Sequence, residues 1–242
     1  MGTTELPFDV DNVDPATTGP QAASLPQAIG IGSMMHSHSA GFDPRLATAP
    51  YQRYREMTID ELLLENRVVF LVGEINYQTA TGVIMRLLHL QNQKQDMDIN
   101  LYINSHGGSV DDTLAVYDTM QHVGCDVATY CIGRAQSGGA MVLSAGTKGK
   151  RFILPHARVM IHQPSGGFQG QASDIEIHAR EILALRQRLN EIYVEHTGRD
   201  LKTIEDAMER DNFLTPDQAK EFGLIDEVVT SRPKSESDEK KD

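Results

Sequence analysis

From about residue 57 onward, apolar and polar positions follow two alternating patterns. Short runs of apolar and β-branched residues at 67–73, 98–104 and 126–132 are typical of buried strands. Between them, residues 79–91 and 110–123 carry apolar side chains at helical spacing. Strands that alternate with helices predict an α/β fold with repeated β-α units and a mainly parallel sheet. In such a sheet, chemistry concentrates at the carboxyl ends of the strands.

The second half of this region predicts a long helix that follows a glycine-rich segment. Two short strands at 151–154 and 158–161 precede an extended stretch at 165–170. A helix is expected from 174 to 196, opened by a capping box between Ser173 and Glu176 and about 34 Å long at 1.5 Å per residue. This length favours a strand-helix handle that packs on another subunit, although a helix that covers the sheet edge fits equally well.

Three shorter elements are expected before the chain loses its pattern. Residues 200–210 predict a helix, and Thr215, Pro216 and Gln218 open a further helix that Gly223 stops. Residues 224–229 predict a last strand. Residues 1–56 are rich in Pro, Gly, Ser and Thr without sustained periodicity, which predicts a disordered or removed segment, and residues 231–242 predict a disordered polar tail.

Composition excludes several classes of protein. The 242-residue chain is 40% hydrophobic and 23% charged, as is ordinary for a globular protein. Its net charge of -12 argues against a nucleic-acid-binding protein, and no run of 18 apolar residues predicts a membrane span. No signal peptide is recognisable, and Cys125 and Cys131 form no C-x-x-C motif. We therefore expect a cytoplasmic protein with reduced cysteines.

The candidate chemistry begins at Ser137, in the turn between the strand at 126–132 and a small-residue helix. The turn partly matches the G-x-S-x-G nucleophile motif, with Ala135 in place of the first glycine. A serine that only caps the helix is the alternative. His162, which ends an apolar strand, is the best candidate base, and His106 is its rival. Asp211, at a helix end, is the candidate third residue, or else a surface charge.

Six motifs carry a resemblance to a known family. The chain resembles the proteolytic subunit of Clp protease over roughly residues 65–229, through INSHGGS at 103–109, GRAQSGGA at 133–140, GKRF at 149–152, RVMIHQP at 158–164, GQASDIEIHAREIL at 170–183 and ERDNFL at 209–214. The resemblance implies a serine protease domain over residues 57–230, with 163–198 as its handle. It also implies a related crotonase-like fold.

The resemblance also assigns roles to residues. It places the catalytic triad on Ser137, His162 and Asp211, and the two oxyanion-hole N–H groups on Gly108 and Gly138. Substrate backbone would pair with the handle stretch Gly166, Gly167, Phe168, Gln169 and Gly170. No metal and no cofactor are implied. The family usually has proline where His106 stands and a bulky residue where Gly138 stands, and a glycine there predicts a more flexible oxyanion turn.

Partners follow from the same resemblance. It implies two stacked heptameric rings, with or without a paralogous subunit, an ATP-driven AAA+ unfoldase and unfolded protein substrates. The expected unfoldase-docking residues are Tyr102, Tyr130, Ile132, Phe152, Leu154 and Val229. Ordinary core is the alternative for these six residues. Two other functions remain open on the residues alone, which are a non-catalytic ring subunit and a crotonase-like acyl-CoA enzyme.

Overall fold

The computed structural model describes residues 57–167 and 169–230. In chain order the elements are α1 (Ile59–Glu65), β1 (Val68–Ile75), α2 (Tyr77–Gln93), β2 (Ile99–Gly108), α3 (Val110–His122), β3 (Val127–Gln136), α4 (Gly138–Ser144), β4 (Arg151–Ile153), β5 (Arg158–Ile161), α5 (Ala172–Thr197), α6 (Leu201–Met208), β6 (Asn212–Leu214), α7 (Pro216–Phe222) and β7 (Glu227–Val228). The predicted α/β class with a mainly parallel sheet is confirmed.

Side-chain caps set most helix starts, but the predicted cap of the long helix is wrong. Thr215 and Gln218 form the expected capping box at α7, with Pro216 in the first turn. Helix α5 instead begins at Ala172 after Gln171, which makes no side-chain capping bond. Ser173 therefore lies inside the helix and is not its N-cap.

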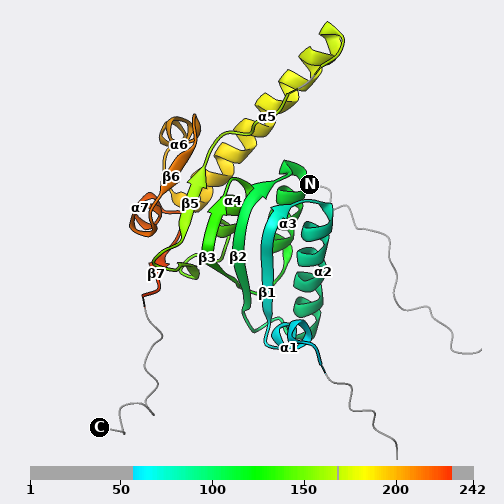
Figure 1. Ribbon diagram of the computed structural model, residues 1–242, viewed down its shortest axis with the longest axis vertical. Helices are drawn as coiled ribbons and strands as arrows, with labels where there is room; N and C mark the ends of the chain where they lie inside the picture. The colour runs from blue at the N-terminus through cyan, green and yellow to red at the C-terminus, as the bar shows by residue number, and fades with distance from the viewer. Residues whose placement is uncertain (1–56, 168, 231–242) are drawn as a thin grey trace, which may run out of the picture. The chain divides into compact units, whose positions relative to one another are not determined.

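One face of the sheet is covered by helices, and the other carries exposed apolar side chains. Figure 1 shows α2 beside β1, and contacts join α2 to β1, α3 to β2, and α4 to β2 and β3, while α3 also contacts both α2 and α4. On β1 the alternation of a strand turns Leu71 toward the core, with no exposed surface, and leaves Phe70 and Val72 exposed at 42% and 52%. The core thus lies between the sheet and these helices.

Strand β3 is the centre of the sheet because it pairs with three neighbours. It lies parallel to β2 along most of its length. Its first half pairs with β4, from Thr129 opposite Arg151, and its second half pairs with β5, up to Gln136 opposite Met160. Strand β6 then adds antiparallel to β5. Because the second half of β3 pairs with β5, the carboxyl ends of these two strands lie side by side, and the candidate site forms there.

Helix α5 extends away from the sheet, as Figure 1 shows. Its 26 residues span about 39 Å at 1.5 Å per residue. Ile175 and Ile177 in its first half are 44% and 57% exposed, whereas Leu189 and Ile192 are buried in the core. The helix therefore combines an anchored second half with an unpacked first half.

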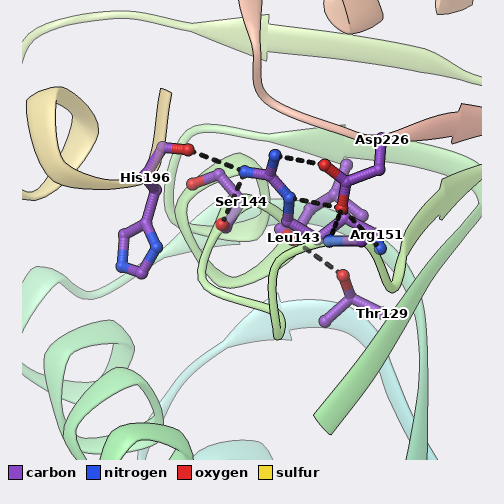
Figure 2. Close-up of polar contacts among 7 residues, drawn as sticks. Thr129, Leu143, Ser144, Arg151, His196 and Asp226 are labelled. Carbon is purple, nitrogen blue, oxygen red and sulfur yellow. Dashed lines mark hydrogen bonds and ion pairs between the residues drawn. The ribbon is translucent and has the colours of Figure 1, made fainter. Parts of the chain in front are cut away.

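An arginine network anchors the base of α5 to the sheet (Figure 2). Arg151 on β4 donates from Nη1 to the carbonyl oxygens of His196, at 2.9 Å, and Ser144, at 3.3 Å. Its Nε and Nη2 donate to the two carboxylate oxygens of Asp226 at 2.9 and 2.6 Å. Nearby, Thr129 donates to the carbonyl of Leu143. One buried cation thus joins β4, the ends of α4 and α5, and the segment before β7.

Strand β2 is longer than the sequence predicts. It runs to Gly108, beyond the apolar stretch at 98–104. Residues 162–167 and 169–171, before α5, belong to no strand of the described chain. Because a strand needs a neighbour to receive its backbone hydrogen bonds, the handle strand stays a prediction for the assembled protein. The predicted segments 1–56 and 231–242 lie outside the described residues.

Across the described ranges, no helix is both long enough and apolar enough to cross a membrane. Cys125 and Cys131 are both free and buried. Burial raises the pKa of the Cys131 thiol to about 11, with a smaller lowering by a backbone hydrogen bond from Gly133. That thiol is therefore protonated at neutral pH and acts as a small apolar group of the core.

Candidate active site

Strand register brings Ser137, His162 and Asp211 together. Gln136 ends β3 opposite Met160, and the amide of Ser137 donates to the Met160 carbonyl at 2.8 Å. Ile161 ends β5 opposite Asn212 on β6. Ser137, His162 and Asp211 are each the next residue beyond these paired positions. The pairing of β3 with β5 and the pairing of β5 with β6 therefore bring these three residues to one point.

The three side chains form a continuous hydrogen-bonded chain. Ser137 Oγ lies 2.8 Å from His162 Nε2. His162 Nδ1 lies 3.2 Å from Asp211 Oδ1. The imidazole is largely covered, with 23% of its side chain exposed, whereas the Asp211 side chain is 61% exposed. This geometry allows His162 to accept the serine proton at one nitrogen while a carboxylate holds the other.

Ser137 has an unusual backbone that presents its hydroxyl at the start of α4. Its φ of 53° and ψ of -123° place a non-glycine residue in a sparsely populated region. Its side chain makes no capping bond to the helix, so the capping alternative fails. Such strain persists only where the surroundings impose it, and it concentrates at functional turns. The hydroxyl is therefore directed to His162.

Gly107 shows how closely the strand β2 approaches this turn. A Cβ added at Gly107 would lie 2.6 Å from Ser137 Cβ and 2.8 Å from the Gln136 carbonyl oxygen. Its φ of 92° also disfavours any other residue. Gly107 is thus needed for this backbone contact with the serine turn, whereas a Cβ at Gly108 would instead overlap the backbone of Ile75 on β1. The rival base, His106, is exposed, and the bond to Ser137 Oγ comes from His162.

A small cavity of about 30 Å³ adjoins Ser137 and His162. Its wall includes the proposed oxyanion glycines, Gly108 and Gly138, so both lie beside the nucleophile. The remaining wall is mostly apolar, from Val110, Thr113, Met141, Pro164, Leu189, Tyr193 and Met208. Burial raises the pKa of Tyr193, so its phenol stays neutral. The nucleophile therefore lies beside a small and mostly apolar recess.

The predicted substrate-binding stretch begins close to this cavity. Pro164 lines the cavity, and Gly166, Gly167, Gln169 and Gly170 are exposed beyond it. Phe168 lies outside the described residues. The backbone of this stretch has no sheet partner in the described chain, so its role in pairing with substrate stays a prediction.

The predicted docking residues lie on the exposed face of the sheet, away from the core. Tyr102, Tyr130, Ile132, Phe152 and Val229 are half-buried, and Leu154 is 39% exposed. Three rings stack in register across β2, β3 and β4, with centroids 4.7 Å apart for Tyr102 and Tyr130 and 4.8 Å for Tyr130 and Phe152. None of the six residues belongs to the buried core, so the core alternative fails.

Sequence reasoning missed two residues that the structure adds to these surfaces. Phe70 stacks on Tyr102 at 5.5 Å and extends the ring series to β1. The alternation of residues 67–73 already gave the signal, since Phe70 faces opposite to Val69 and Leu71. Thr113 lines the cavity beside Ser137, and its position on α3 gave no signal in the sequence.

Comparison with known proteins agrees with this site. The sequence model of the family described as Clp protease matches residues 51–232. The chain is 53% identical over 206 residues to a Rhodopirellula baltica protein named ATP-dependent Clp protease proteolytic subunit 1, which covers 84% of this chain and 91% of the relative.

The chain belongs to the Clp protease family.

Membership of the Clp protease family identifies the chain as a serine peptidase, a hydrolase of peptide bonds. It also implies that the chain forms an oligomer and associates with a Clp ATPase. The resemblance found in the sequence is thereby confirmed. The individual roles of the site residues stay predictions that rest on the geometry above.

Proposed function

We propose that this Clp protease subunit cleaves unfolded polypeptides through a triad of Ser137, His162 and Asp211. The observation that carries the proposal is the hydrogen-bonded chain from Ser137 Oγ to His162 Nε2, at 2.8 Å, and from His162 Nδ1 to Asp211 Oδ1, at 3.2 Å. A nucleophile, a base and an orienting carboxylate in this order are what acyl transfer requires.

In the proposed reaction, Ser137 Oγ adds to the carbonyl carbon of the scissile peptide bond while His162 Nε2 takes its proton. The tetrahedral oxyanion receives hydrogen bonds from the backbone N–H groups of Gly108 and Gly138. His162 gives the proton to the leaving amine, and the acyl-enzyme remains on Ser137. Water then attacks the ester with His162 as base, which releases the acid and restores the serine. Neither a metal nor a cofactor takes part.

Ser137→Ala tests the triad directly. Peptidase activity on a short unstructured peptide should fall to the uncatalysed level, and a fluorophosphonate probe should label the parent protein but not the variant. His162→Ala should lose nearly as much, and the double variant little more, because the two residues act as a unit. His156→Ala, which removes an exposed histidine, is the matched control and should keep full activity. Unchanged hydrolysis or labelling in pure Ser137→Ala protein would end the proposal.

The same test separates the other functions. A non-catalytic ring subunit would show no hydrolysis and no probe label at Ser137. A crotonase-like acyl-CoA enzyme would bind CoA and would keep its activity without Ser137. No observation in the site favours either alternative.

We further propose two stacked heptameric rings that enclose the sites in a chamber, with or without a paralogous subunit. The exposed first half of α5 supports this assembly, since Ile175, Ile177 and Leu183 are 44%, 57% and 62% exposed there. Isolated apolar side chains on a surface are ordinary, but three on a projecting helix need a partner surface. The unpaired stretch at 163–167 would gain a strand neighbour in the same contact.

An AAA+ unfoldase would supply unfolded substrate to this chamber and would itself use the ATP. The exposed ring series of Tyr102, Tyr130 and Phe152 supports its docking site, because flat aromatic surfaces with wet hydroxyls are typical of protein interfaces. The proposed location of the assembly is the cytoplasm.

A further inference from the structure

Gly138 has no room for a side chain, and the reason lies outside its own backbone. A methyl group added at Gly138 would overlap Thr113 Oγ1 and would lie 3.1 Å from Thr113 Cγ2 and 3.2 Å from Thr113 Cβ. Gly138 begins α4, and its backbone φ angle is not positive. Its φ therefore does not exclude an L-residue, and the three atoms nearest to the added methyl group all belong to Thr113.

Thr113 is itself held firmly in this position. It lies in the first turns of α3, is only 2% exposed, and its Oγ1 donates to the carbonyl of Ser109 at 2.7 Å. A β-branched side chain in a helix has few rotamers, and this hydrogen bond selects one of them. Thr113 therefore cannot turn away from Gly138 without loss of this hydrogen bond.

The contact lies directly beside the reacting atoms. Thr113, Gly138, Ser137 and His162 all line the small cavity next to the nucleophile. Glycine gives the backbone of a turn its greatest freedom, which would blur the position of the proposed oxyanion N–H at residue 138. A neighbouring side chain that fills the space over the glycine removes that freedom.

We propose that Thr113 is a positioning residue of the peptidase site, which fills the volume that a side chain at residue 138 would occupy and holds the Ser137–Gly138 turn. This inference rests on the proposed function, because it assigns the Gly138 N–H to the oxyanion. Thr113 and Gly138 are thus a complementary pair, although 25 positions separate them in the sequence. The side chain after the nucleophile is supplied from another helix.

A double-mutant cycle tests the pair, with kcat and KM measured on a short peptide for Thr113→Ala, Gly138→Ala and the double variant. Gly138→Ala should lower kcat about 100-fold, since displacement of a site by about 1 Å costs that much. Thr113→Ala should lower kcat about tenfold with little change in KM, because the turn gains freedom. The double variant should be at least about tenfold more active than Gly138→Ala alone.

Matched controls separate this effect from general damage. Thr119→Ala removes a threonine on the same helix that makes the same type of bond, at 2.8 Å to the Ala115 carbonyl. Gly124→Ala adds a methyl group where nothing lies within 4 Å. Both should keep parental kcat. Thr113→Ser, which retains the Oγ1 atom nearest to residue 138, should restore most of the activity lost in Thr113→Ala.

Two kinetic results would overturn the inference. One is full activity of Gly138→Ala with Thr113 in place, and the other is a double variant whose loss equals the product of the two single losses. Melting temperatures for the same four proteins give a readout that does not need catalysis. The overlap with Thr113 should lower the melting temperature of Gly138→Ala, and the double variant, which lacks the overlap, should regain most of that loss. If the parent protein shows no Ser137-dependent hydrolysis, the proposed function fails, while an additive melting-temperature cycle would refute the packing of Thr113 on Gly138.

Discussion

The ion pair between Arg151 and Asp226 offers the sharpest test of how this fold is held together. The Arg151 side chain is 5% exposed and that of Asp226 is 21% exposed. The carboxylate also accepts from the amides of Gly149, at 2.7 Å, and Arg151, at 3.1 Å. Asp226→Asn keeps the shape but leaves the arginine charge without a counter-charge, in the network that Figure 2 shows.

We expect Asp226→Asn to lower the free energy of unfolding by about 3 kcal/mol. Loss of one partner of a fully buried pair costs about 3–5 kcal/mol, and the partial exposure of Asp226 places this case at the lower end. In a domain of this size, about 3 kcal/mol corresponds to a fall of about 6–12 °C in melting temperature. Thermal and urea unfolding at equal protein concentration would measure both quantities.

The effect should depend on pH in one direction. Burial alone would raise the pKa of Asp226, but its hydrogen bonds and ion pair with Arg151 outweigh burial and hold the pKa below the ordinary aspartate value. A lowered folded-state pKa contributes stability above the unfolded value of about 3.9. The gap between parent and variant should therefore be constant from pH 6 to 8, begin to shrink near pH 4, and vanish as the pH falls through the folded-state pKa.

Asp206→Asn is the matched control, since it breaks an exposed pair with Lys202 in which the side chains are 81% and 70% exposed. Exposed pairs contribute at most about 1 kcal/mol, so this variant should melt within a few degrees of the parent. The reasoning is refuted if Asp226→Asn is no less stable than Asp206→Asn, or if its deficit persists unchanged at pH 3.

Three further predictions concern assembly. Tyr102→Ala should spare hydrolysis of short peptides but abolish unfoldase-driven degradation of a folded substrate, because it removes a ring from the middle of the series. Tyr77→Ala, which changes a residue that is 71% exposed on α2, is the control. Equal loss of both activities in Tyr102→Ala would contradict the docking proposal. The double variant Ile175→Asp, Ile177→Asp should dissociate the stacked rings in sedimentation experiments, whereas Leu201→Asp, at a residue that is 43% exposed on α6, should not. A parent protein that is monomeric at micromolar concentration, both alone and with a paralogous subunit, would contradict the proposal. Mass spectrometry should find residues 1–56 partly removed in assembled parent protein, and an intact Met1 in assembled rings of both parent and Ser137→Ala would exclude a removed segment.

Much of this fold could be predicted from short stretches of the chain, because local periodicity and caps act over a few residues. The apolar runs gave the central strands, and Thr215 with Gln218 gave the start of α7. Ser137 could be placed at a strand end for the same reason. His162 could be placed likewise, but the residues alone left His106 as its rival. That choice needed either the family resemblance or the register of β3 against β5.

The helical stripe on α5 shows where periodicity stops being informative. Ile175, Ile182, Leu185 and Leu189 share one apolar pattern, from which the sequence predicts one partner surface. The structure buries Leu189 at 6% exposure within its own domain and leaves Ile175 exposed at 44%. A periodic stripe reports that a face is apolar, but only the point at which the helix leaves the sheet decides what each residue of that face contacts.

The order of apolar runs and helical patterns was enough to predict the class of the fold and the succession of strands and helices, and the motifs were enough to predict the family and the three residues of the candidate triad. The pairs that join distant segments could be found only from the folded chain. Asp226 lies 75 positions from Arg151, Phe70 completes a ring series begun on β2, and Thr113 closes the space over Gly138. Such pairs leave no periodic signal, because each depends on sheet register and helix packing that bring side chains together across the fold.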